Sequence, residues 1–263
     1  LALLRQERLN DLQQALLAPG ELTQKLKMIT DPVVDIFGAD FCRIWITGEG
    51  DLCELGCMHA GPTEGPHVCH RRDKCLRLMA SSGRYTRTDG VVHQRVPFGA
   101  YKIGRIASGE EHRFLTNDVV NDPRVHNHDW ARKLGLVSFA GYQLRSPGGE
   151  PLGVLALFGT QPITPGEDAQ LDSISATTAR VIEADQSAEA LKKSEEKFRR
   201  LVENLRDDYF FYRRDTTGSF SYVSPSIVNI LGYSVDEFLT RYKEHLTGAL
   251  LNEEYYTDPV FGF

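Results

Sequence analysis

Four of the five cysteines in this chain lie in one short segment, together with three histidines. They are Cys53, Cys57, Cys69, Cys75, His59, His67 and His70. Thiolates and imidazoles are ligands of zinc, and four thiolates can also hold an iron–sulfur cluster. The glycines and prolines between them would let the segment fold back on itself, so that a metal could hold it together. We therefore predict a zinc or iron–sulfur site whose ligands are Cys53, Cys57, Cys69 and Cys75.

The spacing of these cysteines leaves other interpretations open, because it is wider than the spacing in a pair of CxxC motifs. The thiols could instead be redox-active or disulfide-forming, or they could be inert, and a nearby histidine could replace one ligand. A haem held by a histidine or cysteine fits the spacing less well. The fifth cysteine, Cys42, alternates with Ile44 and Ile46 on one face of a predicted strand, so we expect a buried core thiol.

The composition excludes several classes of protein. The chain has 263 residues, with 30 basic and 36 acidic side chains and a net charge of −6, which argues against a surface for nucleic acids. No apolar run is long enough to cross a membrane, so we expect a cytoplasmic location without membrane contact in this part. Because the sequence begins without Met, we interpret it as part of a longer protein that could carry a membrane anchor elsewhere.

Hydrophobic periodicity predicts an alternation of helices and strands. We expect helices at 1–19, 22–37, 73–81, 102–107 and 129–134, and strands at 41–46, 91–96, 114–116, 136–144 and 152–158. The last two strands are separated by a Ser-Pro-Gly-Gly turn and should pair in an antiparallel sheet.

A capping box at Thr164–Glu167 predicts the start of a long helix. Its apolar stripe begins at Leu171 and resumes at Leu191, Phe198, Leu201 and Leu205. A helix of nearly 40 residues cannot be buried by one domain along its whole length. We therefore predict that it connects two domains and pairs with a second copy of itself in a parallel homodimer.

Several motifs resemble those of known signalling domains. The runs IGRIASG, LTNDV, DPR and GVLALF, at 103–109, 115–119, 122–124 and 153–158, resemble a GAF domain. The runs SEEKFR, YVSPS and LGYSVDEF, at 194–199, 222–226 and 231–238, resemble the first part of a PAS domain. This order is similar to the sensory region of bacterial histidine kinases in two-component systems, or of cyclic-dinucleotide enzymes.

The resemblance implies an α+β protein in four parts. These are an N-terminal helix at 1–19, a GAF core with a helix-flanked antiparallel sheet at 20–163, a signalling helix at 164–205 and an incomplete PAS unit at 206–263. It also implies a ligand pocket, for which His93, Arg95 and Tyr101 are our candidates; they could equally lie on the wet side of a half-buried strand.

The expected function is sensory input, in which a small ligand or a redox or metal state is relayed through the helix to an effector outside this chain. The sequence contains no phosphate-binding loop, HExxH or GxSxG motif, and we predict no catalytic residue. The alternative is a thiol redox enzyme or switch that uses the cysteine cluster, because some GAF proteins reduce methionine sulfoxide with loop cysteines.

Overall fold

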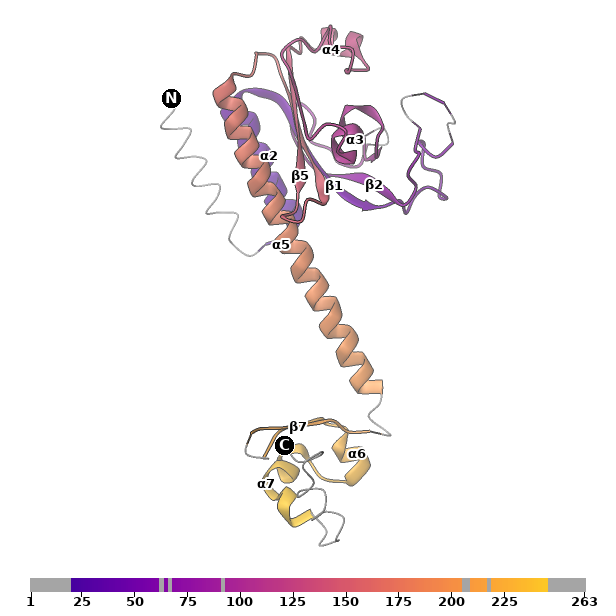
Figure 1. Ribbon diagram of the computed structural model, residues 1–263, viewed down its shortest axis with the longest axis vertical. Helices are drawn as coiled ribbons and strands as arrows, with labels where there is room; N and C mark the ends of the chain where they lie inside the picture. The colour runs from indigo at the N-terminus through magenta and orange to yellow at the C-terminus, as the bar shows by residue number, and fades with distance from the viewer. Residues whose placement is uncertain are drawn as a thin grey trace. The chain divides into compact units, whose positions relative to one another are not determined.

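A computed structural model describes residues 20–61, 64–65, 68–90, 93–204, 209–216 and 219–245 (Figure 1). The chain divides into two compact units between Ser187 and Ala188. The predicted N-terminal helix at 1–19 lies outside the described residues. None of the described helices combines the length and the apolar character needed to cross a membrane.

The first unit is built on a six-stranded antiparallel sheet with the order β3-β2-β1-β6-β5-β4. Its strands are β1 (Ala39–Glu49), β2 (Lys74–Gly83), β3 (Arg95–Pro97), β4 (Arg113–Thr116), β5 (Ser138–Arg145) and β6 (Pro151–Gly159). The central strands β1 and β6 are rich in apolar and β-branched residues and are buried on both faces, as a sheet between two helical layers requires.

Helices cover both faces of this sheet, and each face has its own hydrophobic core. On one face, α2 (Leu22–Phe37) packs beside the first half of α5 (Pro165–Asn204), with Cys42 fully buried as expected (Figure 1). The other face carries α3 (Tyr101–Ser108) and α4 (His128–Lys133) over a core of aromatic residues. Alternation along each strand therefore sends successive side chains into two different cores.

The prediction of a helix at 73–81 is wrong, because residues 74–81 belong to β2. The positions of Cys75, Leu76 and Met79 suggested helical periodicity, but β2 pairs with β1 over its whole length, from Phe41↔Gly83 to Glu49↔Lys74. This non-local pairing satisfies the backbone and outweighs the local pattern. The predicted strand at 91–96 is also shorter, since β3 comprises only Arg95–Pro97 and residues 91–92 lie outside the described part.

The long helix and its capping box are confirmed. The Thr164 backbone N–H donates to Glu167 Oε2 at 3.0 Å, and the Glu167 N–H donates to Thr164 Oγ1 at 3.3 Å. In the first turn of α5, Asp168 Oδ1 accepts from the Tyr142 hydroxyl of β5 at 2.7 Å, and the same carboxylate pairs with Arg113 of β4. These contacts attach the start of α5 to the sheet.

The second unit contains a small hairpin and two short helices. They are β7 (Tyr212–Arg214), β8 (Phe220–Val223), α6 (Ile227–Leu231) and α7 (Val235–His245). Val223, Ile227 and Phe238 form its small buried cluster. A second capping box, Ser234–Glu237, begins α7, where the Ser234 N–H donates to Glu237 Oε2 at 2.9 Å.

Candidate functional site

A pocket of about 290 Å³ lies on the sheet face that α3 and α4 cover. We call it the ring-lined pocket, because most of its wall is aromatic. Its lining residues are Phe41, Arg43, Trp45, Tyr85, His93, Val96, Tyr101, Lys102, Ile103, Val125, His126, Asn127, Trp130, Ala156 and Phe158. Among these described residues there are one arginine and one lysine, Arg43 and Lys102, and no carboxylate.

Lys102 is the most unusual of these side chains, since only 8% of its surface is exposed. Its Nζ lies 5.1 Å from the Phe139 ring centroid and 4.9 Å from that of Phe158. In the described part of the chain it has no hydrogen-bond or ion-pair partner. Burial lowers the pKa of Lys102 to about 8, because the charged ammonium loses its water. An anion in the pocket would restore that lost stabilisation.

Arg43 supplies the second positive charge from β1. Its guanidinium lies over the rings of Phe41 and Tyr85, at 5.4 and 5.3 Å from their centroids, and its Nε donates to Ser81 Oγ at 3.2 Å. These contacts fix the planar group without neutralising its charge. Burial lowers its pKa, but an arginine side chain still remains charged at any physiological pH.

His93 lines the same pocket from the turn before β3. Its backbone carbonyl accepts a hydrogen bond from Trp45 Nε1 at 3.0 Å, which fixes this turn against β1. Although part of the side chain is exposed, partial desolvation and then the positive charges of Arg43 and Lys102 lower the pKa of His93 to about 4. At neutral pH the imidazole is therefore uncharged and can either donate or accept a hydrogen bond.

Tyr101 occupies a strained backbone position at the start of α3. Its φ is 53°, the only positive φ of a non-glycine residue in the described part of the chain. Its ring lies 4.8 Å from that of His126 and 5.9 Å from that of His59, measured between centroids. Such strain costs about 1–3 kcal/mol and is concentrated at ligand sites in many proteins. Here it brings the tyrosine ring to the pocket wall.

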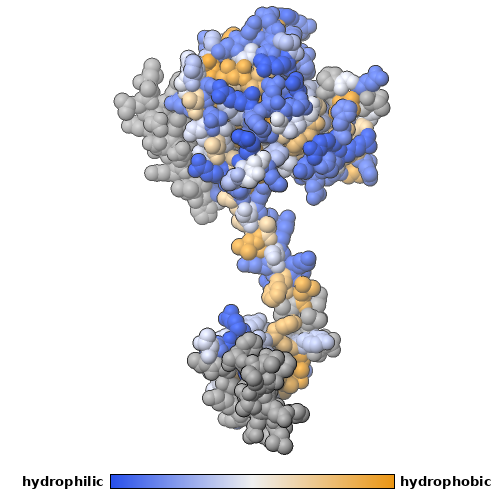
Figure 2. Space-filling view, in the orientation of Figure 1, coloured by the Kyte–Doolittle hydropathy of each residue, from blue (hydrophilic) through white to orange (hydrophobic). Residues whose placement is uncertain are grey.

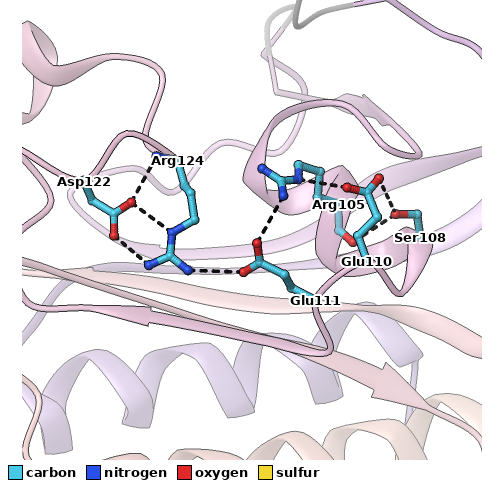
Figure 3. A network of polar contacts seen from close by, with 6 residues as sticks. All are labelled: Arg105, Ser108, Glu110, Glu111, Asp122 and Arg124. Carbon is cyan, nitrogen blue, oxygen red and sulfur yellow. Dashed lines mark hydrogen bonds and ion pairs between the residues drawn. The ribbon is translucent and has the colours of Figure 1, made fainter.

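Two arginines hold the α3 side of the pocket to the loop that supplies Val125–Asn127 (Figure 3). Arg124 donates to Asp122 at 2.8 Å and to Glu111 at 3.4 Å, while Arg105 of α3 donates to Glu111 at 3.2 Å. The hydrogen bond from Arg124 lowers the pKa of Asp122 to about 2, so the contact between Arg124 and Asp122 persists at acidic pH. Glu111 thus joins the two walls.

The predicted ligand residues separate into two groups. His93 and Tyr101 lie on the ring-lined pocket, but Arg95 does not. Arg95 lines a second, much smaller pocket, since β3 begins only at this residue and the expected shared strand face does not exist. Sequence reasoning missed Lys102 and Arg43. The sequence did contain a signal for Lys102. It lies four residues before Ile106 and therefore on the same face of α3, which is buried.

All four predicted metal ligands line that second pocket. Cys53, Cys57, Cys69 and Cys75 surround it with His59 and Arg95, and all four cysteines are free thiols. Burial, and then the neighbouring thiols, raise the pKa of Cys69, so it is protonated at neutral pH. In the described residues, no three His, Cys, Asp or Glu side chains are arranged as ligands of one metal ion.

None of the described cysteines reaches the ring-lined pocket. A thiol reductase needs its nucleophilic sulfur beside the bound substrate. The positions of the cysteines therefore do not favour the thiol-enzyme alternative for this pocket.

The fold and the pocket define an α+β domain with an internal pocket on one face of its sheet. The model of the GAF domain family matches residues 21–183, more than half of the chain. This chain belongs to the GAF domain family.

The chain is also similar in sequence to a curated protein. A methyl sulfide methyltransferase-associated sensor from Methanosarcina acetivorans is 33% identical over 145 residues, which are 53% of this chain and 14% of that protein. The chain therefore spans about one seventh of the length of this relative.

Two solved structures show the same fold. The GAF domain of a phosphoenolpyruvate-protein phosphotransferase from Coxiella burnetii has a TM-score of 0.52 at 20% identity, covering 71% of this chain and 96% of that one. Free methionine-R-sulfoxide reductase from Neisseria meningitidis, in complex with its substrate, has a TM-score of 0.51 at 17% identity, covering 71% and 93%. At these identities the likeness concerns the fold alone.

Proposed function

We propose that this chain is a sensory input module whose ring-lined pocket binds a small organic anion with a flat, apolar body. The observation that carries the proposal is Lys102, a buried ammonium without a counter-ion among the described residues, in a pocket lined by aromatic rings. The curated relative named as a sensor supports the sensory role. The class of ligand follows from the chemistry of the lining residues.

Charge and shape both favour such a ligand. A carboxylate between Lys102 and Arg43 would make charge-assisted hydrogen bonds, which are stronger than neutral ones. An aromatic or conjugated body would pack against Phe41, Trp130 and Phe158. A cationic ligand would meet two positive charges and no carboxylate in the described lining.

The sheet provides a path from the pocket to α5. Phe139 of β5 contacts the Lys102 ammonium, and Tyr142 of the same strand donates to Asp168 in the first turn of α5. Movement of β5 on ligand binding would therefore shift the start of α5. Such a relay requires that the ligand binds the protein more tightly when β5 is in its shifted position than when it is in its original position.

Ligand charge can be tested with two probes of the same shape, phenylacetate and phenylacetamide. We expect the acid to bind at least tenfold more tightly at pH 7, because only the acid compensates Lys102 and Arg43. Isothermal titration calorimetry on the full chain measures both affinities. Equal affinities would contradict the role of charge, and failure of every aromatic carboxylate in a panel would contradict the ligand class.

The affinity for the acid should also depend on pH. If only the protonated ammonium binds the anion, a pKa of about 8 for Lys102 predicts a roughly tenfold loss of affinity between pH 7 and pH 9. The other titratable groups on the pocket are Arg43, Tyr85, His93, Tyr101 and His126. An affinity of the native chain that stays constant between pH 7 and pH 9 would contradict this role of Lys102.

We further propose that α5 pairs with the same helix of a second chain in a parallel homodimer. Three large side chains of its second half are exposed: Leu191 by 62%, Phe198 by 69% and Leu201 by 54%. Their spacings of seven and three fit one face of a coiled coil, and Figure 2 shows apolar surface along this part of α5. The predicted fourth member of the stripe, Leu205, lies outside the described residues.

Phe198→Glu tests this dimer. We expect the variant to sediment as a monomer at concentrations where the native chain is dimeric, because two buried glutamates would face each other. Arg199→Glu is the control, since Arg199 is exposed and lies one position away from the apolar stripe. Sedimentation velocity measures both, and a native chain that is monomeric at high concentration would contradict the proposal.

The resemblance of residues 206–263 to the first part of a PAS domain remains part of the proposal. In this segment the hairpin of β7 and β8 precedes α6 and α7. In this proposal α5 joins the GAF domain to a PAS domain, and an effector outside this chain produces the response.

A further inference from the structure

The segment between β1 and β2 has an unusual distribution of side chains. Leu55 and Met58 face solvent, at 78% and 47% exposure, while Val68, His59 and Cys69 are buried. No described residue between 50 and 75 belongs to any of the three hydrophobic clusters. A long connection whose described residues form no helix or strand needs some other source of order.

The two ends of this segment bring the four cysteines together. The Gly50 N–H donates to Asp73 O at 3.1 Å, which closes the base of the loop. Within it, the Cys57 N–H donates to Leu52 O at 3.1 Å and the Cys69 N–H donates to His59 O at 3.2 Å. As a result, cysteines separated by up to 22 positions line one pocket.

We propose that Cys53, Cys57, Cys69 and Cys75 bind one zinc ion as four thiolates. Four thiolates that line one small pocket supply the donor set that tetrahedral structural zinc requires. In the described structure no three of them are yet arranged as ligands of one ion, so zinc would have to draw the sulfurs together. Binding replaces four protons by one Zn²⁺, with no change of oxidation state, and the protons pass to solvent. This inference does not depend on the ligand proposed for the ring-lined pocket.

The directions of the thiol groups show which contacts zinc binding must break. Cys53, Cys69 and Cys75 point toward the backbone oxygens of Arg72, Arg71 and Glu49, at 3.8, 3.2 and 3.3 Å. A thiolate has no proton to donate, so deprotonation releases each sulfur from its carbonyl. Rotation about χ1 then brings it toward the centre of the pocket.

The surroundings favour a single ion of this kind. The pocket has a volume of about 10 Å³, close to that of one water-sized sphere, whereas an iron–sulfur cluster contains several atoms. Zinc with four thiolates carries a net charge of −2. Arg95 lines the pocket with only 15% of its side chain exposed; its Nη2 pairs with Asp51 at 3.3 Å, while its Nε and Nη1 have no hydrogen-bond partner among the described residues. Asp51 also pairs with Arg77 at 2.8 Å, so the two arginines share one carboxylate, and their remaining positive charge would compensate part of the charge of the zinc site.

Metal analysis of the purified full chain tests the proposal directly. We expect about one zinc per chain by mass spectrometry, no iron or acid-labile sulfide, and four thiols that react with iodoacetamide only after chelation. Each of C53S, C57S, C69S and C75S should lower the zinc content at least fivefold. Cys42→Ser is the matched control and should keep its zinc, since Cys42 is buried in the core between the sheet and α2 and does not line this pocket.

A second measurement covers variants that fail to fold. Cobalt(II) added to the metal-stripped native chain should give the near-ultraviolet charge-transfer and visible bands of a tetrahedral thiolate site, saturate at one equivalent and be displaced by zinc. His59→Gln should leave these bands unchanged. Stoichiometric iron and sulfide, no uptake of zinc or cobalt, loss of zinc from Cys42→Ser, or altered bands in His59→Gln would each overturn the four-thiolate zinc assignment.

Discussion

Replacing Lys102 with methionine should make the protein more stable and abolish anion binding. Methionine has a similar length and is apolar, so it can occupy the space between Phe139 and Phe158 without burying a charge. The lowered pKa of Lys102 corresponds to a desolvation cost on the order of 3 kcal/mol in the free energy of unfolding. A gain of that size would identify Lys102 as a residue kept for binding at the expense of stability.

The pH dependence of this gain has a definite sign. Lys102 has a native-state pKa of about 8, below its ordinary value of 10.5, so the unfolded chain binds more protons between these two values. Stability of the native chain therefore rises with pH in that window. The advantage of Lys102→Met should be complete below about pH 8 and shrink as the pH approaches 10.5.

Urea denaturation at several pH values measures the stability, and calorimetry with phenylacetate measures binding. Lys133→Met is the control, because Lys133 lies exposed on α4 and its replacement should change neither quantity by more than about 0.5 kcal/mol. A destabilised Lys102→Met protein would show that the ammonium contributes to folding, and unchanged binding would remove it from the site.

Gly104→Ala should reduce both stability and binding. A Cβ atom at Gly104 would lie 2.0 Å from the backbone oxygen of Pro97 and 3.2 Å from the Gly99 nitrogen. The Gly99 N–H also donates to Gly104 O at 2.9 Å, so α3 cannot withdraw without losing this bond. Because backbone cannot rotate aside as a side chain can, we expect a loss of about 3 kcal/mol or more.

The binding defect would follow from the same displacement. Lys102 lies two residues away on α3, so movement of the helix would also move its ammonium relative to Arg43. We expect at least a tenfold loss in affinity for phenylacetate. Gly166→Ala is the matched control: nothing lies within 4 Å of its added Cβ, and alanine in the first turn of α5 should be neutral or stabilising by about 0.5 kcal/mol. Equal effects of the two substitutions would contradict close packing at α3.

Local sequence signals were sufficient where the interactions that decide the structure are themselves local. The capping box at Thr164–Glu167 was recognisable because its partners are three residues apart. The Ser146–Gly149 turn placed β5 and β6, and the glycine after Ser108 placed the end of α3. The GAF fold followed from motifs that lie on these same elements.

The error at β2 has the opposite origin. Its cysteine, leucine and methionine are compatible with a helix when read alone, and pairing with β1, at a distance of about 30 residues in the sequence, decides for a strand. Non-local strand pairing also explains why Arg95 and His93 line different pockets. The pairing of β3 with β2 begins at Arg95, and this position determines which pocket each side chain faces.

The sequence by itself determined which chemistry is available: four thiols in one segment, a long helix with an exposed apolar stripe, and a GAF domain. Only the tertiary structure decided how that chemistry is distributed. It placed Lys102 and Arg43 together among aromatic rings, and it gathered the cysteines in a separate pocket. The physical reason is that burial, and with it the energy of a charge, depends on neighbours that come from other strands and helices, which no local pattern specifies.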